Sequence, residues 1–175
     1  MAANNNTNSK SSTSTIVKSI KTNWALLLGI LLIIVVLVAL YVIKEFSGTK
    51  AANLAKYYVG VSYFKQNDFN KAVEYLKDFS TDAKQVQAIA YGTLGDAYAE
   101  LKKNDEAVEY YKKAGNLFPE DENISSEYLY RAAAFLEVNG KSKEAVEIYT
   151  AIKNKYPKSE KGLNADKYIN RLQVQ

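Results

Sequence analysis

The longest apolar run of the chain covers residues 24–43 and contains no charged side chain. A helix of that length extends about 30 Å, which matches the hydrocarbon thickness of a bilayer. Trp24 and Tyr41 lie near its two ends and Lys21 and Lys44 flank it, as is typical of membrane interfaces. The pattern predicts a transmembrane anchor over residues 24–43. A cleaved signal peptide and a buried core helix are the alternatives, but the run is longer and more uniformly apolar than either requires.

Polar segments border this run on both sides. Residues 1–23 are rich in Asn, Ser and Thr, which predicts a disordered polar tail. Residues 44–51 contain Ser47-Gly48-Thr49 and are expected to form a short linker. Lysines are equally frequent on the two flanks, but those of the tail are not offset by acids. Because long folded domains cross a membrane largely regardless of charge, we expect the N-terminus to be cytoplasmic.

The chain beyond the linker repeats itself, with apolar positions at helical spacing. Three stretches begin at Asn53, Ala88 and Ser126, and each contains a polar break near its middle. Each stretch therefore predicts two antiparallel helices, and together they fill residues 52–158. Small residues recur in register because a larger side chain would force closely crossing helices apart. The positions in register are Gly60, Gly95 and Ala133, then Tyr63, Tyr98 and Leu136, then Ala72, Ala107 and Ala145, then Leu76, Tyr111 and Tyr149.

Residues 159–175 form a fourth, partial element. Leu163, Ile169 and Leu172 are spaced to form one apolar stripe, and Ser159 is a suitable N-cap. A stacked array exposes an apolar end that needs a covering helix, so we expect a C-terminal capping helix. The predicted fold class is all-α: one N-terminal transmembrane helix, three helix pairs forming an α-solenoid, and this cap.

The second stretch carries the clearest family pattern, and it resembles the tetratricopeptide repeat (TPR) family. The chain departs from that pattern at Phe79, where Ala is usual, and at Lys56, Tyr91 and Leu129, which occupy the position of the usual Trp. The residues that match the structural signature are Gly60, Tyr63, Ala72, Leu94, Gly95, Tyr98, Ala107, Tyr111, Ala114, Pro119, Ala133, Ala145, Tyr149 and Pro157.

The TPR resemblance implies that the first helix of each pair lines a groove that binds other proteins or peptides. Ordinary packing between repeats is the alternative role for the same positions. The clamp that some relatives use to grip chaperone carboxylates is not assembled, because Tyr57 and Val61 occupy two of its positions and Arg131 stands alone. The predicted groove residues, which grade from apolar and aromatic to acidic, are Leu54, Tyr57, Val61, Phe64, Ile89, Asp96, Tyr130 and Glu137.

Composition argues against chemistry at this groove. The chain has no Cys and no His, so thiolate catalysis and the commonest metal ligands are absent. We expect no catalytic residues, no cofactor and no metal. The net charge is +4, of which residues 1–23 contribute +3, so the repeats are nearly neutral and no basic nucleic-acid surface is expected.

An anchor followed by such repeats resembles the ancillary subunits of the bacterial Sec translocon, and the segment from Gly48 to Phe64 is similar to the versions in Bacteroidetes. This resemblance implies a non-enzymatic scaffold in the inner membrane with periplasmic repeats. Its expected partners are translocon subunits or a membrane-bound periplasmic chaperone. The alternatives are an import or fission adaptor of an organellar outer membrane with cytosolic repeats, and, as a third interpretation, a cell-envelope enzyme.

Overall fold

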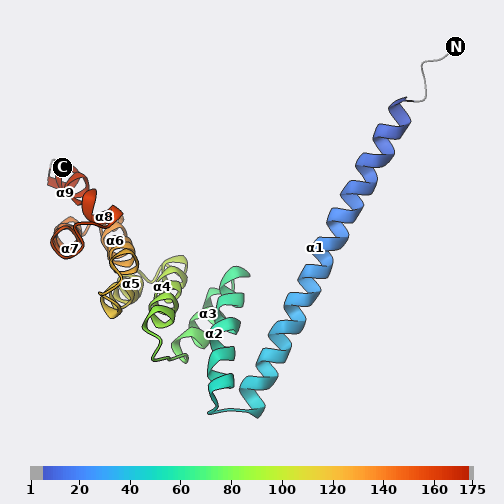
Figure 1. Cartoon of the computed structure of the whole chain (residues 1–175), viewed down its shortest axis with the longest axis horizontal. Helices are drawn as coiled ribbons and strands as arrows, with labels where there is room; N and C mark the ends of the chain where they lie inside the picture. The colour runs from blue at the N-terminus through green and yellow to red at the C-terminus, as the bar shows by residue number, and fades with distance from the viewer. Residues whose placement is uncertain (1–5, 174–175) are drawn as a thin grey trace.

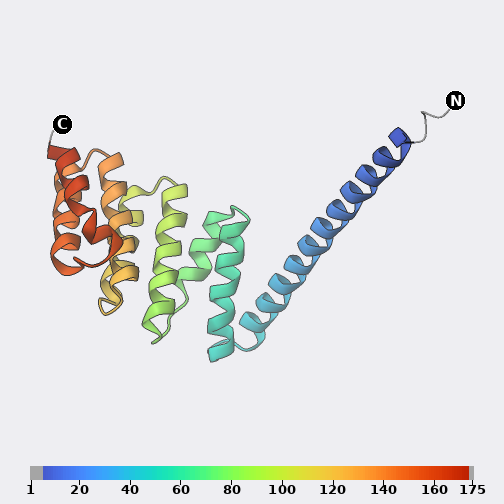
Figure 2. The same cartoon turned by 45° about the horizontal axis from the view of Figure 1, so that its top comes forward.

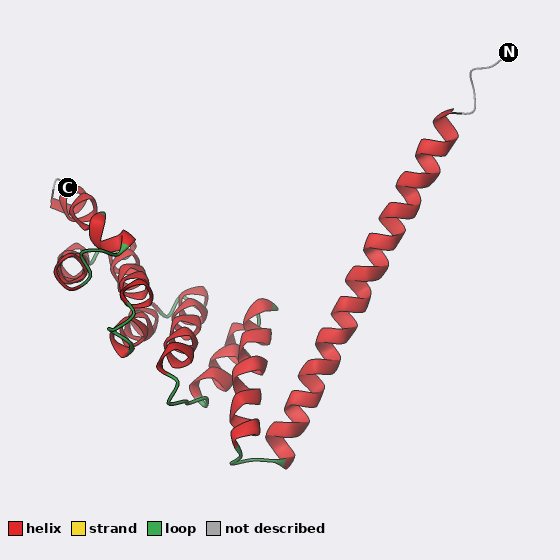
Figure 3. Cartoon of the chain, viewed as in Figure 1, coloured by secondary structure: helices red, strands yellow, loops and turns green. Residues whose placement is uncertain are grey.

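The computed structural model describes the backbone of residues 6–173 and the side chains of residues 23, 24 and 26–173. Over this range every element is an α-helix and none is a strand, as predicted (Figure 3). The helices follow one another along the chain as successive antiparallel pairs (Figure 1). Their bounds are α1 Asn6–Glu45, α2 Lys50–Lys65, α3 Phe69–Lys77, α4 Lys84–Glu100, α5 Asn104–Leu117, α6 Glu122–Val138, α7 Ser142–Lys155, α8 Glu160–Leu163 and α9 Ala165–Gln173.

Helix α1 begins well before the apolar run. A disordered tail was expected over residues 1–23, but the helix already starts at Asn6, and residues 1–5 lie outside the described range. Nucleation is the step of helix formation that is unfavourable in free energy, whereas adding a residue to an existing helix is not. An apolar helix can therefore extend into a polar flank. Within α1, the segment Leu26–Glu45 is long and apolar enough to cross a membrane, and it is not buried in the protein. A signal sequence near an N-terminus can have the same length and hydropathy.

A tight turn reverses the chain after α1. Gly48 adopts a left-handed φ of 84°, a conformation that favours glycine. The Thr49 hydroxyl oxygen then caps α2 by accepting from the Ala52 amide at 3.1 Å. As a result, α2 turns back beside the last turns of α1, and the remaining helices diverge from it (Figure 2). The half-buried residues of α1 there are Val36, Ala39, Leu40, Val42 and Ile43.

The small residues in register lie where the helices of a pair cross. A Cβ atom on Gly60 would come within 2.6 Å of the Leu76 side chain, and one on Gly95 within 2.6 Å of the Tyr111 ring. Ala133, the third member of the register, is fully buried. The prediction that these small residues allow the helices to cross closely is therefore confirmed.

The first helices of the pairs lie on the inside of the curved stack. The backbone of α4 approaches those of both α2 and α6, and α6 also approaches α8. The backbones of α3, α5 and α7, the second helices, do not approach one another. We call the side formed by α2, α4, α6 and α8 the inner face.

The C-terminal cap consists of two short helices, α8 and α9, instead of one. The chain turns at Asn164, which separates them. Leu172 is buried against α6 and α7, with Ile169 and Tyr168 packed beside it. Leu163, expected in the same stripe, is 74% exposed, because the turn breaks the helical register that would have aligned it. The last two residues, 174–175, lie outside the described range.

Candidate protein-binding face

The apolar end of the inner face presents two exposed side chains. Leu54 on α2 is 46% exposed and Ile89 on α4 is 38% exposed. Both were predicted to face the groove, and both lie in the second turn of their helices. Exposed aliphatic residues on a concave surface are suited to contact an apolar segment of another protein.

Three further predicted groove residues are half-buried and contribute to packing. The Tyr57 ring lies 5.2 Å from the Phe79 ring between centroids, and the Phe64 ring lies 5.6 Å from that of Phe69. Val61 packs, with Tyr57, against the core cluster that contains Leu76 and Leu94. Burial also raises the pKa of the Tyr57 hydroxyl. Packing between helices, the alternative role considered for these positions, therefore accounts for much of their surface.

Tyr128 joins the inner face without having been predicted. Its ring from α6 lies directly over Gly92 of α4, where no Cβ atom would fit. Tyr128 is half-buried and packs against the same core cluster as Tyr57. The signal in the sequence was Gly92 itself, since a glycine in a helix interior often marks a close approach by another group.

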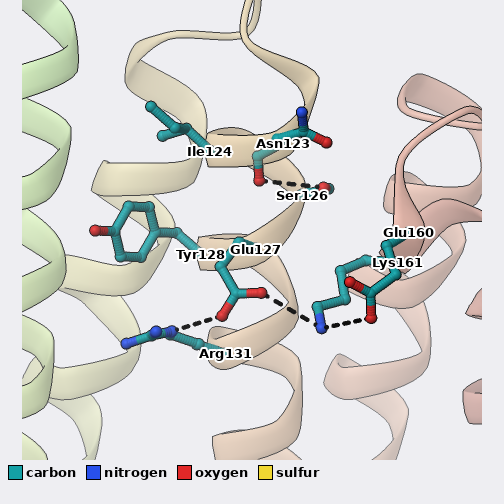
Figure 4. A pocket seen from close by; sticks show the side chains of 8 residues that line it. All are labelled: Asn123, Ile124, Ser126, Glu127, Tyr128, Arg131, Glu160 and Lys161. Atoms are coloured by element: carbon teal, nitrogen blue, oxygen red, sulfur yellow. Dashed lines mark hydrogen bonds and ion pairs between the residues drawn. The ribbon is translucent and has the colours of Figure 1, made fainter.

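A ladder of alternating charges crosses the inner face beyond Tyr128 (Figure 4). The Arg131 guanidinium donates to Glu127 at 2.9 Å and to Asp96 at 3.2 Å. Lys161 continues the ladder at 3.4 Å from both Glu127 and Glu160. The side chains around it line a cavity of about 410 Å³ between α6 and α8, and these are Asn123, Ile124, Ser126, Glu127, Tyr128, Arg131, Glu160 and Lys161.

The acidic side chains of the ladder favour the charged forms of Arg131 and Lys161. Burial acts to lower the pKa of Arg131, but its contacts with Glu127 and Asp96 outweigh this and raise the pKa overall. For Lys161, burial again acts to lower the pKa, and Glu127 and Glu160 raise it. The Tyr111 hydroxyl donates to Asp96 at 2.7 Å, and its pKa is raised by burial and by this carboxylate. Arg131 and Lys161 therefore hold their protons more firmly than the same side chains do in water.

Tyr130 and Glu137, the last predicted groove residues, lie against the cap. The Tyr130 ring is 5.0 Å from that of Tyr168, and the Lys161 ammonium lies 4.6 Å from its centroid. Glu137 pairs with Arg171 at 2.7 Å and accepts from the Tyr149 hydroxyl at 3.2 Å. Asp96 and Glu137, the acidic residues of the predicted groove, are therefore both engaged in ion pairs.

The structure offers no arrangement for metal chemistry in the part of the chain that it describes. No group of three or more Asp or Glu side chains there is placed to hold a metal ion.

Most residues of the predicted TPR signature are buried and contribute to packing between helices. Tyr63 is half-buried and Pro119 and Pro157 are exposed, whereas the remaining signature residues are all buried.

Successive antiparallel helix pairs with small residues at each crossing, stacked around an inner face, define an α-solenoid of helical-hairpin repeats. Sequence models described as Tetratricopeptide repeat match residues 54–83, 88–121 and 128–159, which is more than half of the chain. The protein therefore belongs to the tetratricopeptide repeat family, whose members are generally non-enzymatic and bind other proteins. No curated protein matches the chain. The finer resemblance to Sec translocon subunits gains no support from these comparisons.

Proposed function

We propose that the protein is a membrane-anchored, non-enzymatic scaffold that binds an extended segment of a partner protein along its inner face. The observation that carries this proposal is the pair of exposed aliphatic side chains, Leu54 on α2 and Ile89 on α4, on helices of the same inner face as the charge ladder. An extended peptide can place apolar side chains on the first part and charged or amide groups on the second.

The proposed anchor is α1. Its apolar segment spans the right length, is not buried in the protein, and carries interfacial aromatic residues and lysines at its ends. Anchoring would raise the local concentration of a membrane-bound partner, so that individually weak contacts suffice. We place the protein in a bacterial inner membrane with a cytoplasmic N-terminus and periplasmic repeats. The proposed partners are the protein-translocation or envelope folding machinery.

The alternative function is an import or fission adaptor on an organellar outer membrane, with the repeats in the cytosol. The two differ in topology, and the absence of Cys makes topology easy to measure. A single Cys at Thr150, an exposed position on α7, reports the location of the repeats through labelling with a membrane-impermeant maleimide. Labelling in spheroplasts with intact inner membranes supports the periplasmic placement, and labelling only after lysis overturns it.

Crosslinking in intact membranes, followed by purification and mass spectrometry, tests the binding face. Exchanging both Leu54 and Ile89 for Ser should weaken partner capture about tenfold, because it removes apolar burial from the interface. Phe46→Ser is the control, since it removes an exposed apolar side chain from the turn before α2, outside the inner face. Equal capture by the two variants would overturn the proposed face. Loss of helicity in the double variant would show that the two side chains serve the core.

A further inference from the structure

A second cavity, of about 700 Å³, lies where the apolar helix meets the first repeat. Ile43 of α1 forms one side of it, and Lys56 of α2 and the C-terminal part of α3 form the rest. None of these residues is among the predicted groove residues or in the charge ladder. The residues that line the cavity are Ile43, Lys56, Glu74, Tyr75, Lys77 and Asp78.

The position of Ile43 sets the depth of this cavity relative to a membrane. Ile43 is the last residue of the uncharged run, and Lys44 and Glu45 follow directly. If α1 spans a bilayer, Ile43 lies at the boundary between hydrocarbon and headgroups. The cavity then opens at the level of the phospholipid headgroups.

The side chains around the cavity are also typical of the headgroup region of a membrane. Helix α2, which turns back beside α1, contains three lysines and no acidic residue. Three exposed aromatic side chains near this end are Tyr41, Phe46 and Tyr58. Aromatic rings and lysines with apolar stems are the side chains that membrane interfaces favour.

The cavity is lined by two lysines and two acidic residues, so its formal charges balance. One lysine and one acidic residue among them form no ion pair within the described part of the chain. Lys56 already pairs with Asp78, through both the carboxylate and the main-chain carbonyl oxygen. Glu74 and Lys77 form no ion pair with any residue that the structure describes. A lysine ammonium has three donors, so Lys56 also keeps one N–H group for a further acceptor.

We propose that this cavity binds the headgroup of a phosphatidylethanolamine lipid, an inference that rests on the proposed spanning of the membrane by α1. The lipid phosphate accepts hydrogen bonds from Lys77 and Lys56, and its primary ammonium donates to Glu74 and Asp78. The acyl chains continue along Ile43. A quaternary choline ammonium has no N–H group to donate, and an anionic headgroup leaves the Glu74 carboxylate without a cation.

Nanodiscs that contain equal amounts of phosphatidylethanolamine and phosphatidylcholine provide the test. The full-length chain is released in mild detergent and its retained lipids are identified by native mass spectrometry. The parent chain should retain one phosphatidylethanolamine, enriched about fivefold over phosphatidylcholine, as one or two partly exposed ion pairs would give. Exchanging both Glu74 and Lys77 for Gln should remove the enrichment.

The matched control exchanges Lys143 and Glu147 for Gln, which removes one positive and one negative exposed charge from α7. This control should keep the enrichment. Equal retention of the two lipids by the parent, or preferential retention of phosphatidylglycerol when that lipid is added, would overturn the site. Resistance of the chain to alkaline extraction is measured in parallel. Resistance without enrichment overturns the headgroup site alone, whereas release by alkali overturns the anchor and the site together.

Discussion

At the scale of single residues, close approaches between helices determine which side chains the inner face tolerates. Gly92 is covered by the Tyr128 ring, and Gly162 lies directly against the backbone of Tyr156. Neither glycine has a positive φ, so the requirement comes from space and not from backbone conformation. Substitutions that would be harmless on an exposed helix are therefore costly here.

Gly92→Ala should lower the free energy of unfolding by about 1–3 kcal/mol, because its Cβ atom would overlap the Tyr128 ring. On an exposed helix the same change would stabilise by up to about 1 kcal/mol. Urea unfolding of the full chain in detergent, followed by circular dichroism, measures the difference. In a Tyr128→Ala background the Gly92→Ala change should become neutral or stabilising. An equal loss in both backgrounds would contradict the proposed overlap.

At the scale of elements, the C-terminal cap shows both what the sequence predicts and where it fails. The position of the cap and the burial of Leu172 followed from apolar spacing and from the exposed end of a repeat array. The turn at Asn164 did not follow, because Asn occurs both in helices and at their ends, and tertiary packing decides between them. The exposure of Leu163 is a consequence of that turn.

Leu172→Ala should destabilise the chain by about 2–4 kcal/mol, because it opens a cavity beneath the cap. Leu163→Ala removes the same atoms from an exposed site, so its effect should stay within about 0.5 kcal/mol. Thermal unfolding of the two variants side by side makes the comparison. Similar losses in both would mean that the two leucines share one buried stripe after all.

At the scale of the whole molecule, ion pairs between described residues connect some neighbouring repeats and not others. Arg131–Asp96 and Lys141–Asp105 join the second repeat to the third. Arg171–Glu137 joins the third repeat to the cap. Within the described residues, no ion pair joins residues 54–83 to the second repeat. The sequence predicted the repeats and their order, but residues about one repeat apart become neighbours only when the helices stack, so these pairs were not predicted.

Hydrogen exchange should therefore be faster in the first repeat than in the second and third. Its second helix, α3, has 9 residues, whereas α5 and α7 have 14 each. A short helix in a repeat that has no ion pair to the next repeat should have a lower free energy of local unfolding than the rest of the stack. Exchange measured by mass spectrometry on peptides from α3, α5 and α7 tests this, and equal protection in all three would contradict it.

Low pH should weaken the ion pair between Lys141 and Asp105. The hydrogen bond and the charge of Lys141 lower the pKa of Asp105 in the folded chain. The unfolded chain therefore takes up this proton at higher pH, so the stabilisation is complete above about pH 3.9 and is lost as the pH falls through the lower folded value. Asp105→Asn should lower the melting temperature at pH 7, and this difference should shrink towards about pH 3.

The matched control for the acid experiment is Asp82→Asn. Asp82 is an exposed acidic residue that makes no ion pair with the described residues. Its melting difference from the parent should not change with pH as that of Asp105→Asn does. A parallel trend in both variants would assign the acid effect to net charge instead of to the ion pair.

The ion pairs across the stack have a consequence for how such a chain can lengthen or be rearranged. Arg131 occupies a position that is held by Tyr58 in the first repeat and by Thr93 in the second. A duplicated second repeat would place Thr93 opposite Asp96, which would then keep only the Tyr111 hydroxyl as a partner. The repeats share one architecture, yet each is adapted to the neighbour that follows it. Modular gain, loss or exchange of a repeat therefore requires a compensating substitution in the adjoining one.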